Sequence, residues 1–363
     1  MKIIAFYLPQ FHSIPENDKW WGKGFTEWTN TKKALPLYRG HSQPKEPLND
    51  NYYNLLNDDV KKWQIELAKE YGIYGFCYYH YWFNGKKVLE KPLEQVLNNS
   101  SLDLPFCISW ANEPWTRSWD GKTNEILLAQ DYGDKKDWYN HFQYLLQFFK
   151  DQRYIKIDNQ PLLVIYKVES IPNHKMLFEY WINLARKNGF KGLYIAETLN
   201  GLQKNSVSNL SNAIIQFEPN FTIHHDRPLI DKIKNKIKNI TLIPSKGSFI
   251  YKTMDYDITW KRILKRKINL NDKDVFLGGF VDWDNTARKG KNALVFHGGS
   301  PEKFKKYLKL QIKNAKLKYN SDFIFINAWN EWAEGTYLEP DKKYGNSYLK
   351  AVKEALEESE NLY

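Results

Sequence analysis

Eight short segments of the chain consist mainly of β-branched, aromatic and other apolar residues. Most of them follow a proline, a glycine or a polar break, which is typical of buried β-strands. We therefore predict eight strands, at 3–8, 73–80, 105–110, 161–167, 192–197, 213–218, 275–281 and 323–329.

Segments with helical periodicity lie between many of these strands. In 57–71, an Asn-Asp start precedes apolar residues at positions 60, 63, 67 and 71, which approximates one face of a helix. Ser300 is suited to cap a further helix, with Pro301 at its first position. The predicted helices are 57–71, 86–98, 135–151, 174–188, 301–319 and 345–359.

Strands that alternate with helices predict a parallel sheet, and eight such strands predict a closed (β/α)₈ TIM barrel. The 363 residues suit one barrel with insertions, so we expect a single catalytic domain over 1–363. A doubly wound sheet is the alternative architecture. The longest interruption is a basic insertion at about 220–274, between strands six and seven.

Much of the net charge of +11 comes from this insertion, through DKIKNKIKNI (231–240) and RILKRK (262–267). One interpretation is a solvated, lysine-rich surface segment. The other is a basic lid over a charged glycan or a lipid-linked substrate, because a loop of this length is usually functional or separately ordered.

Polar and aromatic residues gather where the predicted strands end. In a (β/α)₈ barrel these carboxyl ends face one side, which holds the active site. Core packing alone would not place such residues there so consistently. The candidates on or after strands one to seven are His12, Glu27, Trp28, His80, Trp82, Trp110, Asn112, Glu113, Arg117, Glu218 and Asp282.

The most informative stretch is FIFINAWNEWAEGTYLEP, residues 323–340. Its apolar strand passes directly into Trp329, Asn330, Glu331, Trp332 and Glu334. This mixture suits a sugar, whose C–H face stacks on aromatic rings while its hydroxyls bind acids and amides.

The spacing of Glu331 and Glu334 predicts a pair of carboxylates. In one helical turn, side chains three residues apart share a face, and Gly335 supplies a stop for such a turn. Retaining glycoside hydrolysis uses carboxylates about 5–5.5 Å apart. A mechanism with Glu113 as the acid and Glu331 as the nucleophile is the rival assignment. Two of six tryptophans or more are expected to contact substrate: Trp28, Trp82, Trp110, Trp115, Trp329 and Trp332.

Asp282-Trp283-Asp284 matches the D-x-D motif of many nucleotide-sugar transferases. Without a glycine-rich phosphate loop nearby, hydroxyl binding is the favoured role, and we expect neither a metal nor another cofactor. His224-His225-Asp226 is expected to be loop.

Composition and motifs limit the classes of molecule that the protein is expected to bind. The chain has no zinc-finger spacing, RNP signature or basic region joined to heptads, so nucleic acid is not expected. The partner expected is an oligosaccharide or polysaccharide, and the net charge of +11 is compatible with an anionic or lipid-linked one. The cysteines Cys77 and Cys107 are expected to be inert core thiols. With no signal-like start and no apolar run of transmembrane length, we expect a cytoplasmic protein without a transmembrane segment.

Five blocks carry a family resemblance: YLPQFH (7–12), WWGKGFTEWTN (20–30), FCYYHYWFNGK (76–86), WANEPWTRSWDG (110–121) and 323–340. Together they resemble WbsX-like proteins, which are associated with O-antigen and other polysaccharide gene clusters and are often described as glycosyltransferases. The EWAEGT sequence also resembles glycoside hydrolase family 99, the endo-α-mannosidases, which are (β/α)₈ barrels.

The resemblance to the mannosidases implies a mechanism. Glu331 would act as a general base on the sugar 2-hydroxyl, which attacks C1 to give a 1,2-anhydro sugar. Glu334 would protonate the leaving oxygen and then activate water. The primary hypothesis is thus a retaining glycoside hydrolase or transglycosidase. The alternatives are a nucleotide-sugar-dependent glycosyltransferase of polysaccharide assembly and a non-catalytic glycan-binding barrel.

Overall fold

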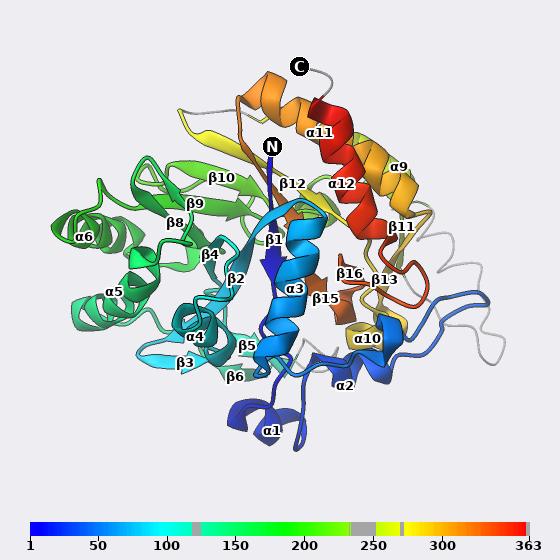
Figure 1. The fold of residues 1–363 in the computed structure, drawn as a ribbon, viewed down its shortest axis with the longest axis horizontal. Coiled ribbons are helices and arrows are strands. Elements are labelled where there is room, and N and C mark those ends of the chain that lie inside the picture. The colour runs from blue at the N-terminus through cyan, green and yellow to red at the C-terminus, as the bar shows by residue number, and fades with distance from the viewer. Residues whose placement is uncertain (118–124, 232, 234–251, 269–271, 361–363) are drawn as a thin grey trace.

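The computed structural model describes residues 1–117, 125–231, 233, 252–268 and 272–360. Eight parallel strands pair in a ring, in the order β1-β14-β12-β10-β9-β8-β4-β2, and β2 pairs with β1 to close it (Figure 1). This closure confirms the (β/α)₈ barrel and excludes the doubly wound alternative. The barrel strands are β1 (Lys2–Tyr7), β2 (Ile73–Phe83), β4 (Phe106–Trp110), β8 (Gln160–Ile165), β9 (Tyr194–Leu199), β10 (Ala213–Gln216), β12 (Asp274–Phe280) and β14 (Phe323–Asn327).

Helices flank the ring, with α5 and α6 on one side and α9, α11 and α12 on the other (Figure 1). Their caps follow from the sequence: Asn57 accepts a hydrogen bond from the Asp59 amide, and Ser300 from the Lys303 amide. The helices are α1 (Pro15–Trp21), α2 (Glu27–Lys32), α3 (Asp58–Glu70), α4 (Lys91–Asn98), α5 (Lys135–Lys150), α6 (His174–Lys187), α7 (Asn220–His225), α9 (Tyr256–Lys265), α10 (Thr286–Lys289), α11 (Pro301–Tyr319) and α12 (Ser347–Glu360).

Short elements decorate the ring, mostly between a barrel strand and the next long helix. The short strands are β3 (Lys86–Val88), β5 (Trp115–Thr116), β6 (Ile126–Leu128), β7 (Lys156–Ile157), β11 (Lys252–Asp255), β13 (Leu294–His297), β15 (Asn330–Glu331) and β16 (Thr336–Tyr337). The 3₁₀ turns are η1 (Leu48–Asp50), η3 (Val168–Ser170), η4 (Gly290–Asn292) and η5 (Trp332–Glu334).

One helix prediction is wrong at its start. Residues 86–88 form β3, which pairs antiparallel with the end of β2, and α4 begins only at Lys91. Asn84 and Gly85 both have positive φ, at 46° and 83°, which is the geometry of a two-residue hairpin turn. The Asn-Gly sequence therefore extends the strand through a hairpin before the helix can begin.

The barrel interior is filled below its carboxyl end by aromatic rings. The ring of Phe6 lies 4.9 Å from that of Phe217 and 5.6 Å from that of Phe325, measured between centroids. Cys77 and Cys107 are buried free thiols on β2 and β4, as predicted. This packed interior gives the segments after the strands a rigid floor.

The described part of the insertion packs against elements that flank the barrel. Its helix α9 packs against α11, and β11 pairs in parallel with β13, where Lys252 lies opposite Leu294. Most of the run 231–240 lies outside the described residues, so its lid interpretation stays a prediction. In the described part of the chain, no helix combines the length and apolar character needed to cross a membrane.

Candidate active site

A cavity of about 450 Å³ opens among the segments that follow the barrel strands. Its wall includes Glu331 and Glu334 from the segment after β14 and Glu113 from the segment after β4. The remaining lining residues are Leu8, Tyr79, Tyr81, Ala111, Pro114, Trp115, Tyr166, Gly201, Leu202, Phe217, Asn220, His224, Arg288 and Lys289.

Glu331 and Glu334 lie at the two ends of the 3₁₀ turn η5. Because a 3₁₀ turn has three residues, side chains at i and i+3 are eclipsed, so the turn aligns the two carboxyl groups. Gly335 ends the turn in the left-handed conformation, with φ 64°. This confirms the predicted stop, although the turn is 3₁₀ rather than α-helical.

Gly335 is also required by its neighbours. A Cβ at this position would lie 2.9 Å from the backbone nitrogen and oxygen of Asp284. The Asp284 amide donates a hydrogen bond of 2.8 Å to the carbonyl of Glu334. The segment after β12 is therefore held directly against the Glu-x-x-Glu turn.

Arg288 of α10 joins three glutamates. Its Nη1 donates to Glu334 Oε1 at 2.6 Å, and its Nη2 donates to Glu331 Oε2 at 3.0 Å and to Glu27 Oε1 at 2.7 Å. Glu27 also accepts a hydrogen bond from the Ala333 amide, at 3.2 Å. A single guanidinium thus fixes both carboxyl groups of the Glu-x-x-Glu pair.

The cluster holds more negative than positive charge. Burial, together with the nearby carboxylates of Glu334 and Glu27, raises the pKa of Glu331 to about 8 against the opposing effect of Arg288. Burial also raises the pKa of Glu334. Since these groups titrate together, the proton held near neutral pH belongs to the pair.

Exposure distinguishes the two glutamates. The side chain of Glu334 is 23% exposed, whereas that of Glu331 is 8% exposed. Burial also raises the pKa of Glu113, opposed by the nearby ammonium of Lys167. The cavity therefore contains three acids of raised proton affinity, of which Glu334 and Glu113 are partly exposed.

Tyrosines supply most of the aromatic wall. Tyr79 and Tyr81 are alternate residues of β2, and both point toward the cavity, as alternate side chains on a strand do. Tyr166 lies at the end of β8. Of the six tryptophans considered from the sequence, Trp115 is the one that lines this cavity among the described residues.

The predicted residues His80, Trp82 and Trp110 belong to β2 and β4, but their side chains face the surrounding helices and do not line the cavity. His80 and His141 are joined through their Nε2 atoms at 2.9 Å, and Trp82 stacks on His141 with ring centroids 4.5 Å apart. Trp110 packs edge-on against the same histidine. Burial lowers the pKa of His80 to about 3, so this cluster is a neutral, packed layer beneath α5.

Three further tryptophans pack beneath the site. Trp332 donates from Nε1 to Glu339 at 2.6 Å, and Trp28 donates to the carbonyl of Tyr53 at 2.9 Å. Trp329 is fully buried against Phe76. These indoles brace the loop that carries the glutamates and do not reach the cavity.

Two amides fix the backbone around the cavity. Asn330 accepts from the Leu8 amide at 2.8 Å and donates to the Leu8 carbonyl at 3.0 Å. Asn112 makes the same paired contact with the backbone of Lys167. These two predicted sugar-binding residues thus join the ends of neighbouring segments.

The remaining predicted residues have partners away from the cavity. Arg117 forms an ion pair with Glu125, and Glu218 is bound by Arg266. His12 donates to the carbonyl of Pro9, and burial lowers its pKa to about 4. Burial raises the pKa of Asp282 to about 6, and this carboxylate accepts from the Trp283 amide.

Several residues of the site were not predicted from the sequence. Arg288, Lys289 and Tyr166 were not selected, and His224, expected in a loop, lies in α7 on the cavity wall. The cluster of Glu27, Glu331 and Glu334 requires a nearby cation. This requirement could have pointed to the Ala-Arg-Lys sequence after strand seven. Asp284, the second acid of the D-x-D motif, is engaged by His41 at 2.8 Å and Gln43 at 2.7 Å.

Solved structures with a similar fold include a glycoside hydrolase family 99 endo-α-mannosidase from Bacteroides thetaiotaomicron. The two share 12% sequence identity with a TM-score of 0.57, covering 99% of this chain and 97% of that one. A "glycoside hydrolase-like protein" aligns with 14% identity and a TM-score of 0.57, over 98% of this chain and 93% of that one. At this identity, the likeness shows the fold.

Sequence relatives identify the family. The uncharacterized protein WxcX of Xanthomonas campestris pv. campestris is 34% identical over 359 residues, which is 98% of this chain and 49% of that protein. The chain thus spans about half the length of this relative. The family model described as "Glycosyltransferase WbsX" matches residues 3–352, which confirms the resemblance drawn from the motifs. The chain belongs to the WbsX glycosyltransferase family.

Proposed function

We propose that this protein acts on glycosidic bonds of a bacterial polysaccharide, O-antigen or related, by retaining hydrolysis or transglycosylation. The observation that carries the proposal is the binding of Glu331 and Glu334 by one guanidinium at the wall of an open cavity. Paired carboxyl groups with raised proton affinity are the equipment of acid–base catalysis at a glycosidic bond. Family membership supports the broader assignment as a carbohydrate-active enzyme.

The two glutamates have different proposed roles. Glu334 is the more exposed and is assigned as the acid that meets the leaving-group oxygen. Glu331 is assigned as the base that meets the sugar 2-hydroxyl. At rest the pair holds one proton near neutral pH, because burial raises the pKa of both carboxyl groups. Placing that proton on Glu334 leaves the net charge of the pair unchanged, so Arg288 accommodates either arrangement.

The proposed reaction then proceeds in two steps. Glu331 takes the proton of the 2-hydroxyl, whose oxygen attacks C1, while Glu334 gives its proton to the departing oxygen as the glycosidic bond breaks. Water, or an acceptor hydroxyl, next attacks C1 and loses its proton to Glu334. The C1–O2 bond breaks, Glu331 returns its proton to O2, and configuration is retained overall.

The family description favours a second candidate, a nucleotide-sugar-dependent glycosyltransferase. It requires binding of a nucleotide sugar and predicts dependence on a divalent cation. A rival within the first candidate uses Glu113 as the acid and Glu331 as the nucleophile, because Glu113 lines the same cavity. A non-catalytic glycan-binding barrel remains the third hypothesis.

The test is incubation with the polysaccharide repeat unit of the source organism, with and without nucleotide sugar, followed by mass spectrometry. Cleavage or transfer without nucleotide sugar is the expected result. Glu331→Gln and Glu334→Gln should each reduce turnover about 10²–10⁴-fold. The matched control is Glu357→Gln, at an exposed position of α12, which should keep full activity.

The other outcomes have definite meanings. Chain growth only with nucleotide sugar would reject the hydrolase in favour of the transferase. Full turnover in Glu334→Gln, with a large loss in Glu113→Gln, would move the acid role to Glu113. Binding of the repeat unit without any turnover would favour the non-catalytic barrel.

A further inference from the structure

A second hollow adjoins the cavity on the side of the insertion. This groove of about 630 Å³ shares Glu334, Lys289, Asn220 and His224 with the cavity wall. A ligand whose leaving group meets Glu334 would therefore extend directly into the groove. What fills the groove thus bears on the choice of substrate.

Basic groups dominate this groove. Arg227, just after α7, Lys252, at the start of β11, and Lys289, at the end of α10, all line it. Among the described residues of its wall, Glu334 supplies the one carboxylate. Cations gathered on the wall of a concave surface produce a positive potential that attracts anions.

Arg227 and Lys252 have no acidic partner within 4 Å among the described residues. Arg227 donates from Nη2 to the carbonyl of Thr253 at 3.5 Å, and its buried Nε has no hydrogen-bond partner in the described part of the chain. The side chain of Lys252 is exposed. Their charge is therefore available to a ligand.

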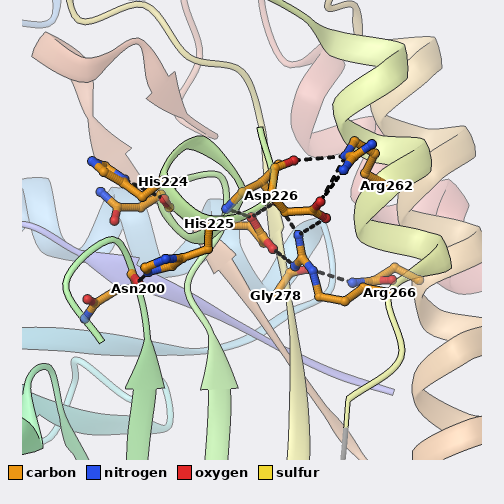
Figure 2. Close-up of polar contacts among 11 residues, drawn as sticks. Asn200, His224, His225, Asp226, Arg262, Arg266 and Gly278 are labelled. Atoms are coloured by element: carbon orange, nitrogen blue, oxygen red, sulfur yellow. Dashed lines mark hydrogen bonds and ion pairs between the residues drawn. The ribbon is translucent and has the colours of Figure 1, made fainter. Parts of the chain in front are cut away.

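The nearest acid in sequence does not neutralise Arg227. Figure 2 shows Asp226 bound by Arg262 and Arg266, which both come from the α9 side of the insertion. Arg266 also binds Glu218, just before α7. These contacts hold α7 and α9 together and leave Arg227 to face the groove.

We propose that this basic groove binds an anionic group, a carboxylate or a phosphate, carried by the saccharide next to the bond that is cleaved. The inference rests on the proposed function, since it places the anion relative to Glu334. Arginine and lysine are the side chains suited to oxyanions, through charge-assisted hydrogen bonds. The anion would also strengthen proton binding by Glu334, which favours its role as the acid.

The test measures binding and needs no turnover. Glucuronate, glucose 1-phosphate and neutral glucose are titrated into the full chain by calorimetry at low and high salt. One or both anionic sugars should bind about tenfold more tightly than glucose, and high salt should reduce the difference. The sugar that shows the preference identifies carboxylate or phosphate as the anion.

Variants locate the binding. Arg227→Gln combined with Lys252→Gln should remove the preference for anionic sugars. The matched control combines Lys261→Gln and Lys265→Gln, two exposed lysines of α9 that line neither hollow, and should keep the preference. Glu334→Gln should increase the preference, because it removes the groove's carboxylate.

Three results would overturn the inference. They are equal affinity for charged and neutral sugars, equal losses in the groove and control variants, and tighter binding of uridine diphosphate with Mg²⁺ than of either anionic sugar. Failure of the proposed function is distinguishable: anionic sugars would still bind through Arg227 and Lys252, but no repeat unit would be cleaved.

Discussion

Two clusters of arginines and acids lie near the carboxyl end of the barrel, and they differ in balance. In the first, Arg288 alone meets Glu27, Glu331 and Glu334. In the second, Arg262 and Arg266 meet Asp226 (Figure 2), and Arg266 also meets Glu218. The first cluster has an excess of carboxylates, whereas the second has equal numbers of each charge.

We infer that the first cluster takes part in the chemistry and that the second cluster stabilises the fold. A balanced set of ion pairs keeps all its groups charged and joins two elements, here α7 and α9. An unbalanced set must retain a proton, which makes it reactive when it faces a cavity. The predictions below test this distinction, in order of decreasing effect.

Removing the cation of the unbalanced cluster should have the largest effect. Arg288→Gln leaves three carboxylates without their shared donor, so we expect kcat/KM to fall by about 10²–10⁴-fold. Arg288→Lys keeps the charge but loses the fork that holds both glutamates, and should fall less. Kinetics on the identified substrate measure both, with the exposed Arg186→Gln as control. Wild-type activity in Arg288→Gln would contradict the proposed site.

Breaking the balanced cluster should instead affect stability. Glu218→Gln removes the charged partner of the largely buried Arg266, and should lower the free energy of unfolding by about 1.5–3 kcal/mol. Denaturant unfolding measures this change, while kcat/KM of the folded protein stays within about twofold. Unchanged stability with lost turnover would show that the second cluster is not structural.

The geometry of the Glu-x-x-Glu turn can be tested without changing any charge. Gly335→Ala places a Cβ 2.9 Å from the backbone of Asp284 at a residue with φ 64°. We expect a cost of about 1–3 kcal/mol in stability and a moderate loss of turnover, because the two glutamates shift. Gly189→Ala, at a positive-φ glycine with open space around its Cβ position, separates backbone strain from the clash. Equal behaviour of the two variants would contradict the steric argument.

The smallest expected effect is a shift in the titration of Glu331. Its pKa of about 8 should decrease in Glu334→Gln, which removes a negative neighbour, and increase in Arg288→Gln, which removes the cation. Carboxyl-selective ¹³C NMR across pH measures the midpoint. A midpoint that is unchanged in both variants would show that the groups are not coupled.

The raised pKa of Glu331 also makes the stability of the protein depend on pH. Between the ordinary pKa of 4.5 and the folded value of about 8, the native protein binds a proton that the unfolded chain lacks. The stability contributed by Glu331 is thus fully present below pH 4.5 and is lost as pH rises through 8. Glu331→Gln should flatten this decline. Glu339, whose pKa burial raises to about 7, contributes equally to parent and variant.

The hairpin turn at Asn84-Gly85 could have been predicted from the sequence. The dipeptide Asn-Gly is the strongest short-range signal for a hairpin turn, and both residues have positive φ in the structure. The apolar spacing that follows nevertheless favoured a helix that begins earlier, at residue 86. Position 91 rather than 86 begins the helix because β3 must first return along β2.

The orientation of side chains on β2 could not be predicted in the same way. The strand is apolar or aromatic on both faces, so no alternation tells which residues point inward. The structure directs Tyr79 and Tyr81 to the cavity, and His80 and Trp82 to the helices. For the same reason, the expected wall of indoles is a wall largely of tyrosines.

The eight strands, the order of strand and helix, and the turn that brings Glu331 and Glu334 together could be predicted from the sequence, because they depend on local periodicity and on the conformation of Gly335. The strand faces that line the cavity and the cation that binds the glutamates depend instead on how distant segments pack together. Arg288 is 43 residues from Glu331 in the chain and meets it only because β12 and β14 are neighbours in the closed barrel. The Glu-x-x-Glu turn follows from neighbouring residues, whereas the proton held by its two glutamates also depends on Arg288, which the pairing of distant strands brings to them.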